Sequence, residues 1–264
     1  MPPDGAATDW TVPQNWAGYS AEEHARWDGL FARQAALLPG RAVDEFIAGL
    51  DILRMDRPGI PDFAALNERL MAATGWQVVA VPGLVPDAVF FDHLANRRFV
   101  AGRFLRGADQ LDYLQEPDIF HDVFGHVPML AHAEFADYMQ AYGRGGLRSL
   151  HYDALDHLAR LYWYTVEFGL VRTAAGLRIY GVGIVSSHAE TLYALDDALD
   201  DVAPHRHAFD LRRVMRTRYR IDDFQASYFV IDSFADLLAQ TVGCDFAPLY
   251  AELAGLDDFA PDAG

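Results

Sequence analysis

Two histidines in an apolar stretch constrain this chain more than any other feature. His121 and His126 lie five residues apart in the segment EPDIFHDVFGHVPML, residues 116–130. On a regular α-helix, at about 100° per residue, such positions point about 140° apart and do not share a face. Gly125 and Pro128 allow the helix to break or bulge here, which turns the second imidazole towards the first. Two converging imidazoles suit a transition metal, whereas a single histidine beside an apolar run is more often a hydrogen-bonded core residue.

A third metal ligand is predicted in a later segment. The run LYWYTVEFGLV, residues 161–171, is apolar on every helical face and contains one acid, Glu167. A buried carboxylate without a partner is costly, so Glu167 needs an arginine or a metal. We favour the metal, because two histidines already lack a third ligand. Together the three have the composition of a facial triad, which in oxygenases binds Fe(II) and leaves open coordination positions.

Other classes of metal protein remain open on these residues alone. Two histidines and a glutamate also bind catalytic zinc. Zinc peptidases, however, place the histidines four residues apart with a glutamate between them, whereas here the spacing is five and the neighbour is Asp122. The mismatch disfavours a peptidase. It leaves a different zinc hydrolase, or a metal-stabilised binding protein without turnover, as alternatives.

Charge and composition exclude several kinds of partner. The chain has 38 acidic and 21 basic residues, a formal charge of −17. Such a charge repels phosphate backbones and anionic lipid, so we expect neither a nucleic-acid nor a membrane partner. The single cysteine, Cys244, cannot form an internal disulfide, and the start MPPDGAATDW lacks the features of a secretory signal. We therefore expect a soluble, cytoplasmic protein.

The hydrophobic periodicity predicts a mainly α fold with a small β component, an α+β domain. We expect one domain over residues 10–254, between flexible tails at 1–9 and 255–264, because no linker interrupts the chain. The glycines within residues 143–146 are predicted to end the helix that begins at residue 134. Helices are expected at residues 21–38, 42–53, 61–74, 87–99, 134–142, 153–171, 188–195 and 234–241, and strands at 76–81, 177–185, 212–220 and 224–231.

The motifs resemble a known family over most of the chain. VPGLVPD, FLR, EPDIFHDVFGHVPML, YWYTVEFGL, YGVGIVSS and FQASYFV are similar to motifs of the pterin-dependent aromatic amino acid hydroxylases, most closely the short bacterial phenylalanine hydroxylases. In that family the metal ligands fall on His121, His126 and Glu167. The resemblance implies a non-haem Fe(II) monooxygenase that uses a tetrahydropterin, tetrahydrobiopterin or a related one. It would convert L-phenylalanine to L-tyrosine with dioxygen, in phenylalanine catabolism.

The resemblance also assigns roles around the metal. Arg106 would bind the substrate carboxylate with help from Ser186, although from the residues alone it could equally pair with a structural aspartate. The loop at 83–85 could likewise be an ordinary turn between a strand and a helix. The predicted pterin-binding residues are Gly83, Leu84, Val85 and Phe90, with Asp122 and Tyr162 nearby; those that shape the substrate pocket are Pro117, Trp163 and Gly183.

Two departures from the animal members affect what the resemblance implies. Those members carry an N-terminal regulatory domain and a C-terminal tetramerisation helix, for which this chain has no room, so we expect a monomer. Leu114 and Gln115 stand where animal enzymes present other side chains to the substrate. Tryptophan or tyrosine hydroxylation therefore stays as an alternative, although the bacterial subgroup favours phenylalanine.

Overall fold

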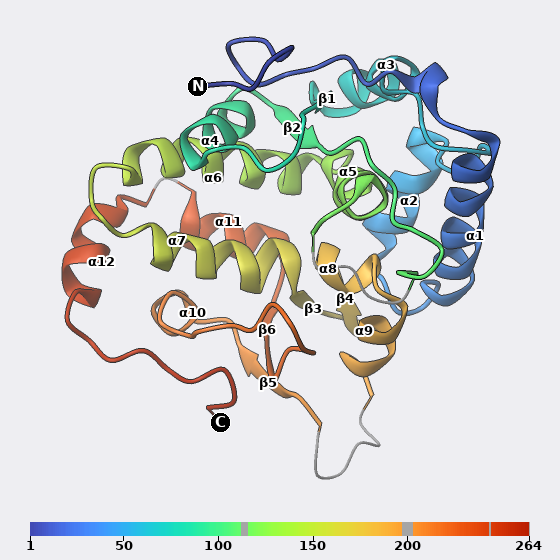
Figure 1. The fold of residues 1–264 in the computed structure, drawn as a ribbon. Helices are drawn as coiled ribbons and strands as arrows, with labels where there is room; N and C mark the ends of the chain where they lie inside the picture. Colours follow the sequence, from blue (N-terminus) through green and yellow to red (C-terminus); the bar gives the residue numbers. More distant parts are fainter. Residues whose placement is uncertain (112–115, 197–202, 243, 264) are drawn as a thin grey trace.

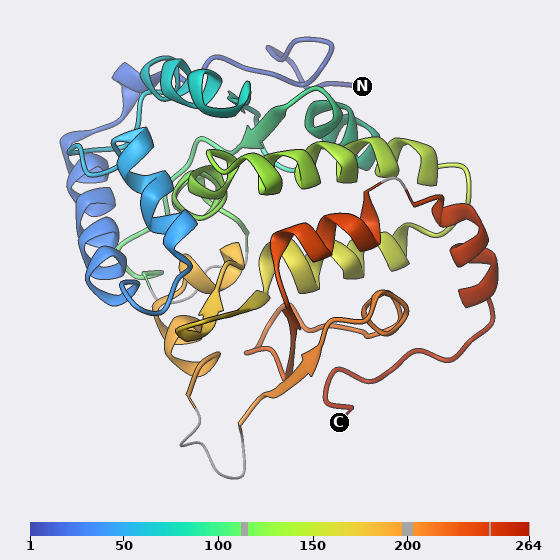
Figure 2. The same ribbon diagram turned by 180° about the vertical axis from the view of Figure 1, so that it is seen from behind.

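The structure, a computed structural model, describes residues 1–111, 116–196, 203–242 and 244–263. Helices predominate, with one two-stranded and one four-stranded sheet among them (Figures 1 and 2). This confirms the predicted α+β class. Leu114, Gln115 and most of the acidic run at 196–201, which the sequence suggests is a solvated helix end and loop, fall outside the described residues. Among the described residues, no helix has the length and apolar content needed to cross a lipid bilayer.

The three predicted N-terminal helices are confirmed and form one side of the molecule (Figure 1). A reciprocal capping box between Ser20 and Glu23 begins the first. Gly49 lies so close to the backbone of Pro128 that a side chain there would clash, so this layer directly supports the histidine segment. The helices are α1 (Ala21–Leu37), α2 (Asp44–Leu53) and α3 (Phe63–Thr74).

A helix and two short strands follow. Strands β1 (Gln77–Ala80) and β2 (Arg98–Ala101) pair in parallel, joined by α4 (Asp87–Ala95). The predicted helix at 87–99 is therefore wrong beyond residue 95. Arg97 adopts a left-handed conformation, φ 54°, which ends the helix, and its guanidinium donates to the carbonyl of Thr74 at 2.6 Å. The chain is thereby redirected into a strand.

Helix α6 (Ala133–Ser149) runs through the glycines that were expected to stop it. That prediction was wrong, because these glycines do not end the helix but allow α4 to pack closely against it. A Cβ on Gly143 would meet the backbone of Ala95, and one on Gly146 would meet the ring of Phe91. Close approach to α4 requires glycine at both positions. Figure 1 shows α6 across the middle of the molecule, with α4 resting on it.

The predicted helix at 153–171 divides into three parts. It begins as α7 (Leu155–Tyr162), widens into a π-helical turn, η3 (Trp163–Glu167), and becomes strand β3 (Gly169–Thr173). The prediction was thus wrong after Glu167. A Cβ on Gly169 would overlap Tyr180, so the chain changes direction in tight contact with a neighbouring segment.

The four-stranded sheet has the order β4-β3-β6-β5. Strand β4 (Gly176–Ile179) is antiparallel to β3, whereas β6 (Ser227–Ile231) runs parallel to β3, and β5 (His205–Ala208) runs parallel to β6. The strand expected at 177–185 therefore ends early, and the rest of that range contains a short helix, α8 (Val182–Val185).

The remaining helices correct two further predictions. Helix α9 (His188–Tyr193) is capped by the Ser187 side chain and ends two residues earlier than expected. The arginine-rich segment 212–220 begins in helix α10 (Leu211–Val214), where a strand was expected, and Arg212 forms a salt bridge with Glu252. The last two helices are α11 (Phe234–Thr241), which the Ser233 side chain caps, and α12 (Phe246–Leu253).

Both expected tails contact the domain in the structure. Asp9 forms an ion pair with Arg98 at 3.1 Å. Asp258 pairs with Arg160 at 2.6 Å, and Phe259 forms an isolated β-bridge with Thr217. The domain limits at residues 10 and 254 stay a prediction.

Candidate active site

A π-helical turn brings the two histidines together. Residues Phe120–His126 form this turn, η2, which leads directly into α5 (Val127–Leu130). In a π-helix each N–H bonds five residues back, so residues five apart lie one above the other. The imidazole rings of His121 and His126 consequently face each other edge to face, with centroids 5.2 Å apart. The predicted bulge is confirmed.

Glu167 completes the cluster from a second π-helical turn, η3. Its carboxylate oxygens lie 3.3 Å from Nε2 of His126 and 3.6 Å from Nε2 of His121. The three ligand atoms all lie within 4.8 Å of one another. No other such group of histidine, cysteine or acidic side chains occurs in the described ranges. Both turns depart from α-helical geometry where their ligands are, as π-bulges at functional sites often do.

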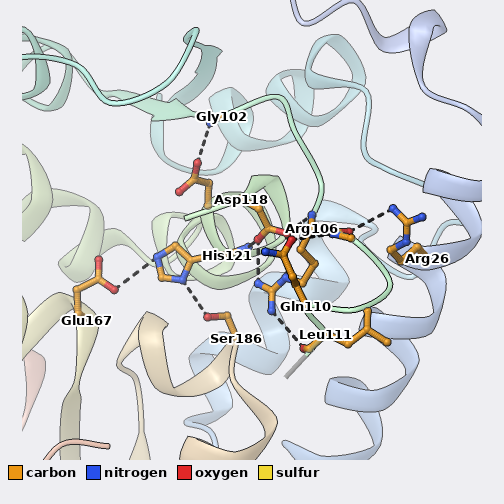
Figure 3. A network of polar contacts seen from close by, with 11 residues as sticks. Arg26, Gly102, Arg106, Gln110, Leu111, Asp118, His121, Glu167 and Ser186 are labelled. Carbon is orange, nitrogen blue, oxygen red and sulfur yellow. Dashed lines mark hydrogen bonds and ion pairs between the residues drawn. The ribbon is translucent and has the colours of Figure 1, made fainter. Parts of the chain in front are cut away.

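Neighbouring groups orient the histidines. Figure 3 shows His121 between Glu167 and Ser186, and Nδ1 of the imidazole lies 3.0 Å from the Ser186 hydroxyl oxygen. If Nδ1–H donates to that oxygen, the lone pair of Nε2 is free for a metal, which is the usual arrangement around ligating histidines. His126 packs against the Phe99 ring with centroids 4.5 Å apart.

The protonation states fit a cation. Burial lowers the pKa of the His121 imidazole to about 4, even though Glu167 favours its protonation. Burial alone would raise the pKa of the Glu167 carboxyl, but His126 and His121 outweigh this and hold it below its ordinary value. Near neutral pH the site therefore offers a neutral imidazole and an ionised carboxylate. This donor set suits a divalent transition metal.

One cavity beside the cluster gathers every predicted pterin residue. Its volume is about 270 Å³, and Phe90 and Tyr162 form an aromatic wall with ring centroids 5.9 Å apart. Asp122 accepts a hydrogen bond from the Gly102 N–H at 2.7 Å, and burial raises the pKa of its carboxyl to about 7. The lining includes Gly83, Leu84, Val85, Phe90, Asp122 and Tyr162 as well as the three candidate ligands.

A second cavity, of about 560 Å³, gathers every predicted substrate residue. It shares His121 and Glu167 with the first cavity, so the candidate metal position lies where the two meet. Its lining includes Arg106, Pro117, Trp163, Gly183 and Ser186. The two groups of residues thus line two cavities that meet at one cluster.

Arg106 pairs with a structural aspartate, one of its two predicted roles, and its predicted role in binding the substrate carboxylate stays a prediction. Its guanidinium forms a two-pronged ion pair with Asp118, with both distances 2.9 Å, while the side chain lines the substrate-side cavity. Asp118 is fully buried and also accepts the backbone N–H of His121 at 3.0 Å, which links the arginine to the metal cluster (Figure 3). The sequence interpretation did not single out Asp118, although its place three residues before His121 is the signal that was available.

The family profile described as biopterin-dependent aromatic amino acid hydroxylase matches residues 11–245. The chain belongs to this family. Curated relatives in the family include phenylalanine-4-hydroxylases from Caulobacter vibrioides, 63% identical over 97% of this chain and 86% of the relative, and from Ralstonia nicotianae, 63% identical over 95% and 79%.

Solved structures of a hydroxylase from Chromobacterium violaceum share the fold. One, with iron(III) and oxidised 7,8-dihydrobiopterin, has a TM-score of 0.91 and 58% identity, covering 98% of this chain and 91% of that one. Another, with iron and phenylalanine, has a TM-score of 0.92 and 56% identity, covering 98% and 92%. Membership of the hydroxylase family removes the zinc hydrolase and the binding protein without turnover as leading interpretations.

Proposed function

We propose that this protein is a phenylalanine 4-monooxygenase that converts L-phenylalanine to L-tyrosine with dioxygen, Fe(II) and a tetrahydropterin. One observation carries the proposal: the cluster of His121, His126 and Glu167 lies where two cavities meet, each lined by one of the two predicted groups of residues. A metal held there by three protein ligands keeps further coordination positions open. A pterin on one side and an amino acid on the other would both reach it.

Each cavity has a separate binding task. Bound Fe(II) and a reduced pterin together supply the electrons that activate dioxygen for attack on an aromatic ring. Phe90 would stack on the pterin, and the 83–85 backbone would bond its edge. Arg106, oriented by Asp118, would bind the substrate carboxylate. Trp163 and Phe168, whose ring centroids are 4.8 Å apart, would hold the substrate ring and exclude water.

The relatives support the choice of phenylalanine. The matched hydroxylases carry that substrate in their names, and one Chromobacterium violaceum structure contains phenylalanine with iron. Tryptophan and tyrosine hydroxylation remain the alternatives within the family. We further propose that the protein acts as a monomer in the cytoplasm, in phenylalanine catabolism, as the expectations from charge and resemblance indicate.

An aerobic assay tests the proposal. The purified protein, loaded with Fe(II), is given a tetrahydropterin and phenylalanine, tryptophan or tyrosine in separate reactions, with product identified by chromatography. We expect tyrosine from phenylalanine, dependent on both iron and pterin. Faster hydroxylation of tryptophan or tyrosine would replace the proposed substrate, and turnover that is independent of pterin would overturn the proposal.

A further inference from the structure

A buried acid on the wall of the substrate-side cavity has no part in the metal cluster. Glu190, on α9, is only 5% exposed and lines this cavity together with Arg106 and Trp163. One carboxylate oxygen, Oε1, accepts both the backbone N–H of Gln225, at 3.2 Å, and the hydroxyl of Tyr228. Within the described part of the chain, the other oxygen, Oε2, has no hydrogen-bond partner.

Glu190 forms no ion pair with an arginine among the described residues that line this cavity. Burial raises the pKa of its carboxyl to about 7, so ionisation there is costly unless a positive charge compensates it. Arg106 is the only arginine or lysine among the described residues that line the cavity, and its ion pair is with Asp118, not with Glu190. A ligand that carries a positive charge would compensate the ionised Glu190 carboxylate.

We propose that Glu190 binds the α-ammonium group of the amino acid substrate. The inference rests on the proposed function, because it takes an amino acid as the occupant of this cavity. An amino acid is a zwitterion, so its recognition needs a cation for the carboxylate and an acceptor for the ammonium. Arg106 and Glu190 line the same cavity and have these complementary charges. A carboxylate that accepts from an ammonium makes a charge-assisted hydrogen bond, one of the strong types.

A purely structural role for Glu190 is the competing explanation. Gln225 donates its backbone N–H to Glu190. The side-chain oxygen of the same residue accepts a hydrogen bond from the Trp163 indole N–H at 2.9 Å. Loss of Glu190 could therefore displace Trp163 and the aromatic wall. Such a displacement would weaken every ligand with a phenyl ring, whether or not the ligand carries an ammonium group. The two roles predict different patterns across ligands that lack one charge.

Inhibition by two phenylalanine analogues separates these roles in the iron-loaded enzyme. 3-Phenylpropanoate lacks the ammonium, and 2-phenylethylamine lacks the carboxylate. We expect Glu190→Gln to raise the KM for L-phenylalanine and the Ki for 2-phenylethylamine by about tenfold, the worth of one charge-assisted hydrogen bond. The Ki for 3-phenylpropanoate should stay within about twofold of its original value, because that ligand has no group for Glu190 to bind.

Three further variants make the test secure. Glu134→Gln, which removes an exposed acid outside this cavity, should leave all three constants unchanged. Tyr228→Phe removes a hydrogen bond to Glu190 but keeps the carboxylate, so 2-phenylethylamine should still bind far better than it binds to Glu190→Gln. If Glu190→Gln does not fold, Glu190→Asp keeps the charge but withdraws it by one methylene, and the same selective loss is expected.

The outcomes distinguish this inference from the proposed function. Equal weakening of all three ligands by Glu190→Gln, or no weakening of any, would overturn the role of Glu190 while tyrosine formation by the unaltered enzyme upheld the proposed function. Failure of the unaltered enzyme to form tyrosine with iron and pterin would instead overturn the proposed function itself.

Discussion

The imidazole rings of His121 and His126 face each other with centroids 5.2 Å apart, although five residues on a regular α-helix would turn them to different sides. The π-helical turn Phe120–His126 makes this possible. Glu167 approaches both rings from the end of a second π-helical turn. Two local departures from α-helical geometry therefore build the candidate metal centre, and its chemistry leads to the first prediction.

Removal of the acidic ligand should weaken iron binding. Glu167→Gln eliminates the one negative charge of the cluster, so we expect iron affinity to fall by about tenfold or more. The measurement is iron content after dialysis against a weak chelator. Glu134→Gln, at an exposed acid in the first turn of α6, is the matched control and should retain iron. Full iron retention by Glu167→Gln would remove Glu167 from the ligand set.

Arg106→Lys should affect the substrate more than the pterin. Lysine keeps the positive charge but cannot form the two-pronged ion pair with Asp118 that orients the guanidinium towards the substrate. We therefore expect KM for phenylalanine to rise by about tenfold while KM for the pterin changes little. Steady-state kinetics with each substrate varied in turn measures both constants. Arg103→Lys, at an exposed arginine nearby, should change neither. Equal increases in both constants would indicate that Arg106 only supports the fold.

Phe90→Ala should produce the opposite pattern. The Phe90 ring stands beside Tyr162 in the pterin-side cavity and is absent from the lining of the substrate-side cavity. Loss of an aromatic stacking surface costs about 1 kcal/mol or more, so KM for the pterin should rise by roughly tenfold with KM for phenylalanine nearly constant. A larger effect on phenylalanine than on the pterin would contradict the assignment of the two cavities.

The glycines of α6 allow a test within one helix. A Cβ on Gly143 would meet the backbone of Ala95, so Gly143→Ala should lower the free energy of unfolding by about 1–3 kcal/mol through overpacking. Gly145 has only the tip of the Arg148 side chain nearby, at 3.9 Å, so Gly145→Ala should raise stability by up to about 1 kcal/mol through helix propensity. Urea denaturation measures both. Stabilisation by both substitutions would show that α4 and α6 are packed less closely.

The same glycines show where sequence interpretation reached its limit. Their local signal is that of a helix stop, and only the approach of α4, far away in the chain, explains their presence inside a helix. The metal ligands could be predicted because a lone acid in an apolar helix and a glycine-hinged histidine pair are unusual within their own segments. Asp118 and Glu190 do not stand out in this way within their own segments, and for Asp118 the only signal was its place three residues before His121. Their roles arise from partners on other elements, Arg106 and Tyr228, which periodicity does not reveal.

The pH dependence of stability should report on Glu190. Burial raises the pKa of its carboxyl from 4.5 to about 7, so the folded state binds this proton more tightly than the unfolded chain does. The resulting stabilisation is complete below about pH 4.5 and is lost as the pH rises through 7. A shift of this size corresponds to at most about 3 kcal/mol.

Glu190→Gln cannot titrate and isolates this contribution. Urea denaturation of both proteins from pH 4.5 to 8 gives the difference in their free energies of unfolding. We expect the unaltered protein to lose stability relative to Glu190→Gln across this range, by up to about 3 kcal/mol. Glu134→Gln, at an exposed acid, should follow the unaltered protein at every pH. A difference that stays constant from pH 4.5 to 8 would mean that Glu190 ionises in the folded protein as it does in the unfolded chain, and that the cavity wall carries a full negative charge before any ligand arrives.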